Sequence, residues 1–142
     1  MRRFAVRMTA VLVCLAAGMG AARATETVDC TAADGSDASV TMNVGVGLPA
    51  ELPNWVRVND GELAWSTLDM DAGPGVTMVN LFQAFDDGRL MSVDLSDADV
   101  TAIVVSIRIL RATEGERTVY AGTLHIPGNA VHPLACSSGD SE

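Results

Sequence analysis

The chain has 142 residues, and its 18 acidic side chains outnumber its nine basic ones, which gives a formal charge of −9. Four of the nine arginines lie within residues 1–24, so the rest of the chain has five basic and 18 acidic residues, a formal charge of −13. These five arginines are scattered, whereas proteins that bind nucleic acid cluster their basic residues. The composition argues against nucleic acid and anionic membranes as partners, and it favours cationic proteins, cationic peptides or metal ions.

Residues 1–24 have the three parts of a secretory signal peptide. Arginines occupy positions 2, 3 and 7, an apolar run follows over 8–19, and the Ala-Arg-Ala at 22–24 matches a cleavage site. The apolar run is shorter than the roughly 20 residues that a membrane-spanning helix needs. We therefore expect export through a cleaved signal peptide and no membrane insertion. The arginine-rich start favours a bacterial protein of the periplasm or the extracellular medium.

The remaining residues predict a single all-β domain over 25–136, followed by a polar tail over 137–142 that we expect to fray. Nearly half of the chain, 49%, is hydrophobic, which is enough to build one core. The tail is short, and no linker-like segment interrupts the sequence before it. One domain is therefore the expected organisation.

The first predicted strands surround an Asp-Gly turn at 34–35. The clearest alternation of apolar and small or polar residues runs over 39–48, which is typical of a strand with one buried face. Its apolar positions are Val40, Met42, Val44, Val46 and Leu48. The preceding strand contains Val28 and Cys30, so residues 28–48 predict a hairpin.

A second hairpin is predicted over 55–66, because the Asp-Gly pair at 60–61 suits a two-residue turn. That turn pairs Val58 with Leu63 and places both residues on the same face as Val56 and Trp65. The opposite, outward face would then hold Trp55, Arg57, Ala64 and Ser66.

Glycine, proline and acidic residues predict further turns at 86–88, 113–116 and 127–129. These turns separate strands that we predict over 76–85, 89–95, 102–112, 117–126 and 131–136. Only residues 96–101 suggest one helical turn, since Ser96 or Asp97 can cap a helix. The sequence thus predicts eight or nine short antiparallel strands, forming a β-sandwich or a small β-barrel.

Two cysteines, Cys30 and Cys136, lie outside the signal peptide, one near each end of the domain. In an oxidising compartment, two cysteines in a small domain are expected to form a disulfide. Redox or metal chemistry usually uses a close Cys-x-x-Cys spacing, which is absent from this sequence.

No catalytic constellation is recognisable, and we predict that the protein is not an enzyme. No serine lies in a Gly-x-Ser-x-Gly elbow, and the histidines are His125 and His132 alone. His125 is expected to face outward and His132 inward. If the turn at 127–129 closes a hairpin, both histidines could approach each other and, with a carboxylate, bind zinc or copper.

Paired carboxylates suggest a second kind of metal site. Asp94, Asp97 and Asp99 are closely spaced, and oxygen ligands of this type bind calcium. The segment matches no established calcium-binding loop, so the alternative is that these aspartates belong to solvated turns. No other cofactor is indicated.

The best candidates for recognition are Trp55 and Arg57, because aromatic and arginine side chains are enriched at interface hot spots. Phe85 and Leu90 flank the turn at 86–88 and predict an apolar rim. Either pair is instead structural if a neighbouring strand covers it.

In its export, size, single predicted disulfide and acidic β-rich composition, the chain is loosely similar to periplasmic inhibitors of lysozyme. This likeness covers general features and assigns no residue. The leading hypothesis is a non-enzymatic binding module with a protein partner, which the charge predicts to be cationic. The alternatives are a periplasmic metal-binding protein, which metal should stabilise against heat, and an inhibitor of a cationic enzyme such as a lysozyme.

Overall fold

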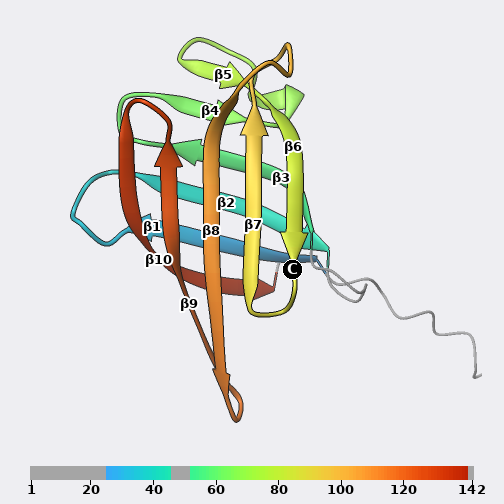
Figure 1. The fold of residues 1–142 in the computed structure, drawn as a ribbon, viewed down its shortest axis with the longest axis vertical. Helices are drawn as coiled ribbons and strands as arrows, with labels where there is room; N and C mark the ends of the chain where they lie inside the picture. Colours follow the sequence, from blue (N-terminus) through green and yellow to red (C-terminus); the bar gives the residue numbers. More distant parts are fainter. Residues whose placement is uncertain (1–24, 46–51, 141–142) are drawn as a thin grey trace, which may run out of the picture.

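The computed structural model describes residues 25–45 and 52–140. Within these residues the chain forms ten strands, and only residues Asp69–Asp71 form a short 3-10 helix, η1 (Figure 1). The strands are β1 Thr25–Ala32, β2 Ser39–Gly45, β3 Pro53–Asn59, β4 Ala64–Ser66, β5 Val76–Met78, β6 Asn80–Asp86, β7 Leu90–Ser96, β8 Ile103–Glu114, β9 Arg117–Ile126 and β10 Ala130–Asp140. The prediction of an all-β domain is confirmed.

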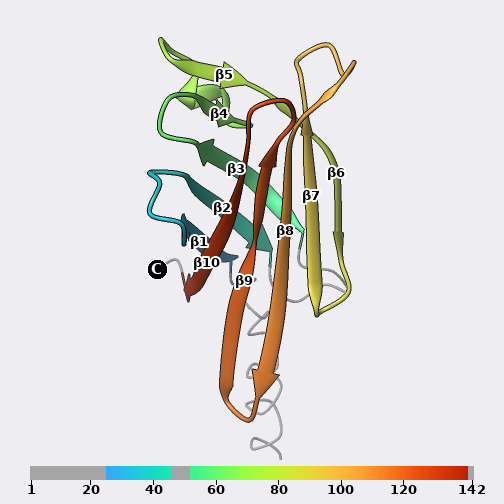
Figure 2. The ribbon, with the colours of Figure 1, turned by 60° about the vertical axis from the view of Figure 1, so that its left-hand side comes forward.

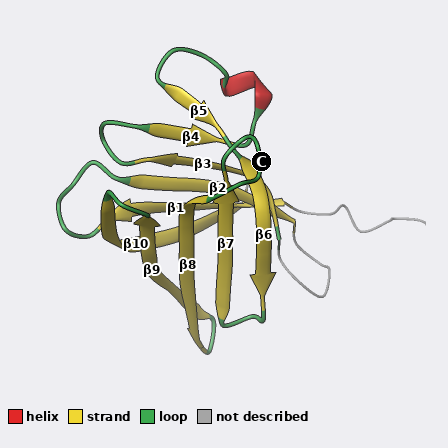
Figure 3. Ribbon diagram, turned by 45° about the horizontal axis from the view of Figure 1, so that its top comes forward, coloured by secondary structure: helices red, strands yellow, loops and turns green. Residues whose placement is uncertain are grey.

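All ten strands belong to one sheet, in the order β5-β4-β3-β2-β1-β10-β9-β8-β7-β6. In Figure 1, β1–β4 run across the view and β6–β9 run along it, while β10 bends from one group to the other. The two end strands, β5 and β6, are separated by Val79 alone, so the sheet nearly closes on itself (Figure 3). Of the two predicted architectures, the fold is therefore barrel-like.

The core is built from every second residue of the strands, as the pleat of a strand requires. In β2, Val40, Met42 and Val44 are each at most 1% exposed. The predicted continuation of this alternation to residues 46 and 48 lies outside the described residues. The buried hydrophobic residues are Val28, Cys30, Ala38, Val40, Met42, Val44, Val56, Val58, Trp65, Val79, Met91, Val93, Leu95, Val105, Ile107, Ile109, Leu124, Ile126 and Leu134.

A disulfide joins Cys30 to Cys136, as predicted, with a Cα–Cα distance of 4.0 Å. The two residues are direct partners in the antiparallel ladder between β1 and β10. Because β1 belongs to one group of strands and β10 leads into the other, the covalent bond fastens the junction between the two groups.

The β3–β4 hairpin forms with a different turn from the predicted one. The Asp60 N–H donates to the Leu63 carbonyl at 3.1 Å, and the Asp60 carboxylate accepts from the Leu63 N–H at 2.7 Å. The turn therefore spans four residues, and Val58 pairs with Trp65 rather than with Leu63. Leu63 is 49% exposed, so its predicted place on the buried face was wrong. The register moves by two residues, which leaves Trp65 on the inward face.

Residues 96–101 form no helix, contrary to the prediction. The Asp97 carboxylate instead closes a loop by accepting the Thr101 N–H at 2.6 Å, and Val100 takes a positive φ of 57°. The number of strands was also underestimated, because residues 76–85 contain two strands rather than one. β5 pairs parallel with β4, whereas β6 pairs antiparallel with β7.

The domain continues past its predicted end at residue 136. Strand β10 extends to Asp140, and residues 137–140 pair with residues 26–29 of β1. The expectation of a frayed tail is therefore wrong for these four residues, whose backbone groups extend the ladder that contains the disulfide. Residues 141–142 lie outside the described residues.

Candidate functional site

One outward surface of the barrel is lined with polar side chains from β2, β3 and β4. We call it the polar face and define it as Ser39, Thr41, Asn43, Trp55, Arg57, Asn59, Ala64, Ser66 and Asp71. Sheet register places these residues side by side, since Thr41 is opposite Arg57 and Arg57 is opposite Ser66. Alternation positions the strand residues here, because their strand neighbours fill the core. Asp71 comes instead from η1, and Ser66, with which it forms a hydrogen bond, is only 2% exposed.

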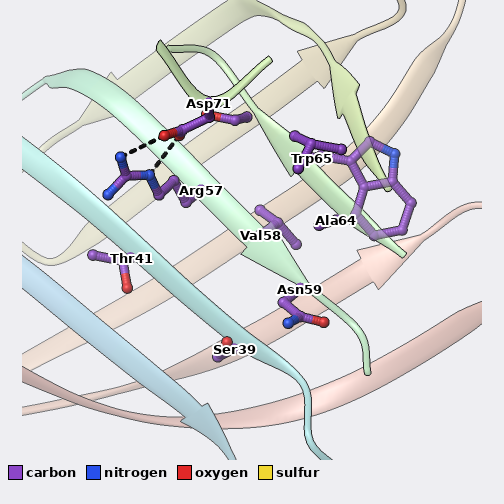
Figure 4. Close-up of a pocket in the computed structure, with 10 residues that line it drawn as sticks. Ser39, Thr41, Arg57, Val58, Asn59, Ala64, Trp65 and Asp71 are labelled. Atoms are coloured by element: carbon purple, nitrogen blue, oxygen red, sulfur yellow. Dashed lines mark hydrogen bonds and ion pairs between the residues drawn. The ribbon is translucent and has the colours of Figure 1, made fainter. Parts of the chain in front are cut away.

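Arg57 and Asp71 form a two-pronged ion pair on this face (Figure 4). The Arg57 Nε donates to Asp71 Oδ2 at 2.5 Å, and a terminal nitrogen donates to Oδ1 at 2.6 Å. Ser66 Oγ also donates to Asp71 Oδ2, at 2.5 Å. The Leu68 N–H in turn donates to Ser66 Oγ at 3.1 Å, so the segment leading into η1 is tied down beside the strands.

These hydrogen bonds stabilise the charged forms of both partners. The Arg57 guanidinium, followed by the Ser66 hydroxyl, lowers the pKa of Asp71 to about 2. The same hydrogen bond raises the pKa of Arg57. The pair is therefore fully ionised at neutral pH, and the fork-shaped contact fixes the plane of the guanidinium.

Trp55 also contacts the guanidinium. The Arg57 Cζ lies 5.0 Å from the centroid of the Trp55 ring, within the range of a cation–π contact. The Arg57 side chain is nevertheless 46% exposed, and Trp55 is only partly buried. Trp55 and Arg57 thus face outward, and Asp71 and the ring hold the arginine in one orientation.

A shallow pocket of about 400 Å³ lies on this face. Its polar lining includes Ser39, Thr41 and Asn59 together with the ion pair, as Figure 4 shows. Hydroxyl, amide and guanidinium groups of this kind can exchange hydrogen bonds with a ligand. The described lining contains no histidine or cysteine that could act as a base or a nucleophile beside these groups.

Two of the three aspartates that suggested calcium, Asp94 and Asp97, are engaged in other contacts. Asp94 is buried in β7, where the Arg108 side chain donates to its Oδ1 at 2.8 Å. Burial opposes its ionisation, but hydrogen bonds from Arg108, Ser106 and Gln83 outweigh burial and lower the pKa of Asp94. The Asp97 carboxylate closes the loop described above, and Asp99 is exposed.

The two histidines do not come together. The 127–129 turn does close the β9–β10 hairpin, but His125 is opposite Val131 while His132 is opposite Leu124. His125 therefore faces outward and His132 inward, where its Nδ1 lies 3.1 Å from Asp34 Oδ2. Within residues 25–45 and 52–140, no group of three or more His, Cys, Asp or Glu side chains is arranged to hold a metal ion.

The predicted apolar rim is divided between two environments. Phe85 is 56% exposed on β6, whereas Leu90 at the start of β7 is partly buried. Sequence reasoning missed Asp71 as the partner of Arg57, although the acidic pair at 69 and 71 was visible. An outward arginine can form a two-pronged contact with a carboxylate, and a search for such a partner of Arg57 could have suggested Asp71.

No helix among the described residues has the length and the apolar character needed to cross a membrane. Comparison with known proteins gave no match among family models, curated proteins or solved structures.

Proposed function

We propose that this chain is an exported, non-enzymatic binding domain that recognises a partner protein through the polar face. The observation that carries the proposal is that Arg57 contacts both Trp55 and Asp71 while nearly half of its side chain remains exposed. A side chain fixed before binding loses little conformational freedom when a partner docks, so its contacts contribute more to affinity. Tryptophan and arginine are also the residue types that most often dominate interface energetics.

The charge of the chain favours a cationic partner. Outside residues 1–24 the formal charge is −13, and a field of this sign attracts basic proteins and accelerates their association. Asp71 neutralises the single arginine of the polar face, so this face does not repel such a partner. A basic hydrolytic enzyme of the cell envelope belongs to this class.

Export is the second part of the proposal. A disulfide that closes the domain is consistent with an oxidising compartment, and residues 1–24 match a cleavable leader. The periplasm and the extracellular medium both fit these features. Mass spectrometry of the secreted chain should find an N-terminus at Thr25.

The test is cross-linked capture of partners from the native cell envelope with the tagged mature domain. A charge-matched acidic domain serves as the bait control, and the affinity of each enriched protein is then measured in solution. We expect Trp55→Ala to weaken binding of the true partner at least ~30-fold, which corresponds to about 2 kcal/mol. Rising salt should weaken the same complex if the acidic charge contributes.

A matched variant makes this test specific for the polar face. Phe82 is an aromatic residue of β6 that is 52% exposed, and Phe82→Ala should leave the affinity unchanged. Equal binding by wild type and Trp55→Ala would remove the polar face from the site. Enrichment of no protein over the charge-matched bait would contradict the binding proposal itself.

A further inference from the structure

A second outward surface, formed by β7–β10, carries a row of apolar residues across four strands. Leu90 is opposite Leu110, Leu110 is opposite Ala121, and Ala121 is opposite Ala135. We call these four residues the apolar row. Leu110 is 61% exposed, and both alanines are exposed. An uncovered row of this kind on a sheet is typical of an interaction surface.

The β8–β9 hairpin extends the apolar row into an arm. The ladder of β8 with β7 ends at Leu110, and the Arg111 N–H still donates to the Arg89 carbonyl at 2.7 Å. The ladder of β9 with β10 ends at Tyr120, so residues 112–119 project beyond the neighbouring strands (Figure 2). Ala112 pairs with Val119 on the same outward side as Leu110, and Val119 is 53% exposed. An isolated two-stranded hairpin is marginally stable at best in water, so contact with a second surface would stabilise this arm.

The surface around the apolar row is electrically balanced. The outward residues of β7–β10 include two acidic groups, Asp94 and Glu114, and two arginines, Arg108 and Arg117, which gives a formal charge of zero with histidine neutral. Outside residues 1–24 the formal charge of the chain is −13. This surface, which we call the neutral face, can therefore approach a second copy of the acidic chain with little repulsion.

The charges on the neutral face permit a second copy to pack on it. A twofold axis along the apolar row reverses the strand direction of the second copy and places Leu110 over Leu110. Glu114 and its ladder partner Arg117 in each arm then face Ser106 and His125 of the other copy. Arg108, which is already paired with Asp94, faces Ala112. No carboxylate of β8 or β9 therefore faces another carboxylate, so two identical surfaces can meet across the axis.

We propose that the neutral face is the interface of a homodimer, in which two copies stack their apolar rows and each arm lies across the other copy. Face-to-face packing of two sheets is an established way to bury such rows. The polar face lies on other strands and stays open in this dimer. The proposal is therefore independent of the function proposed above.

The experiment is sedimentation velocity of the oxidised mature protein over a range of concentrations. We expect the wild type to form dimers, and Leu110→Glu to raise the dimer dissociation constant at least ~100-fold, because each twofold interface receives two buried charges. Val119→Glu on the arm should weaken the dimer in the same direction. The control is Met70→Glu, since Met70 is 82% exposed on η1 and should leave dimerisation unchanged.

A monomeric wild type at every concentration would overturn the proposal, as would a dimer that resists both Leu110→Glu and Val119→Glu. Weakening of the dimer by Met70→Glu to the same extent would also overturn it, since the effect would then come from charge alone. Leu110 is exposed, so the urea midpoint of its variant should stay near that of the isolated wild-type monomer. Trp55→Ala should dimerise normally, which separates this test from the test of the polar face.

Discussion

The polar face and the neutral face are built by the same backbone pattern and have opposite chemistry. On the polar face, the exposed Arg57 is tied to Asp71 and stacked beside Trp55. On the neutral face, the side chains of Leu110 and Val119 are largely exposed. Because inward positions of the strands alone build the core, the outward positions are free to differ. One barrel can therefore present a surface prepared for a polar partner and another prepared for apolar contact.

The largest expected effect comes from cutting the covalent bond that joins the two groups of strands. The disulfide closes a loop with a sequence separation of 106 residues, and in the chain-entropy model a loop of this size stabilises the fold by about 4–5 kcal/mol. Cys30→Ala with Cys136→Ala should lower the free energy of unfolding by that amount. Urea unfolding of the double variant and of the reduced wild type provides the measurement.

The position of the disulfide also links the stability of the two faces. Both depend on the junction between β1 and β10, so the double variant should lose partner binding and dimerisation together at temperatures where it is partly unfolded. A loss of less than about 1 kcal/mol would mean that the ladder between β1 and β10 holds without the bond. Retention of one face and loss of the other would show that the two groups of strands fold separately.

A smaller loss of stability is expected from substitution of Gly122 in β9, one of the four strands that form the neutral face. A Cβ at this position would clash with the Arg108 carbonyl oxygen and lie 3.1 Å from the Ile109 Cα, both of which are backbone atoms of β8. Overpacking of this kind usually costs about 1–3 kcal/mol, and a clash with backbone should place Gly122→Ala at the upper end. Thermal and urea unfolding would measure the change.

Gly139 in β10 is the matched control for that substitution. An added Cβ at Gly139 meets no atom within 4 Å, so Gly139→Ala should change stability by less than about 0.5 kcal/mol. Gly122→Ala should also weaken the dimer, because it displaces the strand that carries Ala121 and Val119. Equal stability of the two variants would show that β8 and β9 can separate without loss, contrary to the close approach of the β8 backbone to Gly122.

The sequence predicted those features that depend on local pattern or on simple counting. Alternation identified the buried face of β2, acidic and glycine residues identified the turns, and two cysteines allowed one pairing. The β3–β4 turn was predicted two residues too short because the Asp-Gly pair suits a tight turn, while the Asp60 carboxylate favours the longer one by accepting from the Leu63 N–H. Local propensity alone does not decide between these two turns.

The missed features depend on contacts between residues that are distant in sequence. Arg57 and Asp71 are 14 residues apart, and their meeting requires η1 to return beside β4. The apolar row combines residues of four strands and exists only when the register of three ladders is known. Its members were visible singly, and Leu90 alone was identified. Surfaces of a sheet are therefore harder to predict than its core, because the core needs only alternation within each strand.

The smallest expected effect separates the two faces by their response to acid. The Arg57 hydrogen bond, followed by that of Ser66, lowers the pKa of Asp71 to about 2, below the usual value near 4 for an unfolded chain. A carboxylate with a lowered pKa stabilises the fold above the unfolded pKa, and this contribution disappears as the pH falls toward the folded pKa. Asp71→Asn should therefore be less stable than wild type above pH ~5, and the difference should shrink to zero near pH 2.

Urea unfolding at a series of pH values measures this difference. Asp69→Asn is the control, since Asp69 is an exposed aspartate of the same helical turn and its replacement removes the same charge. The Asp71→Asn variant should keep some acid sensitivity from Asp34, whose pKa is lowered to about 2 mainly by hydrogen bonds from Ser36, with a smaller contribution from His132. Partner binding should weaken over the same acidic range if Asp71 orients Arg57, whereas dimerisation through Leu110 should not. A stability difference that is constant from pH 7 to pH 2 would show that Asp71 acts through packing, and the arginine of the polar face would then not be oriented by charge.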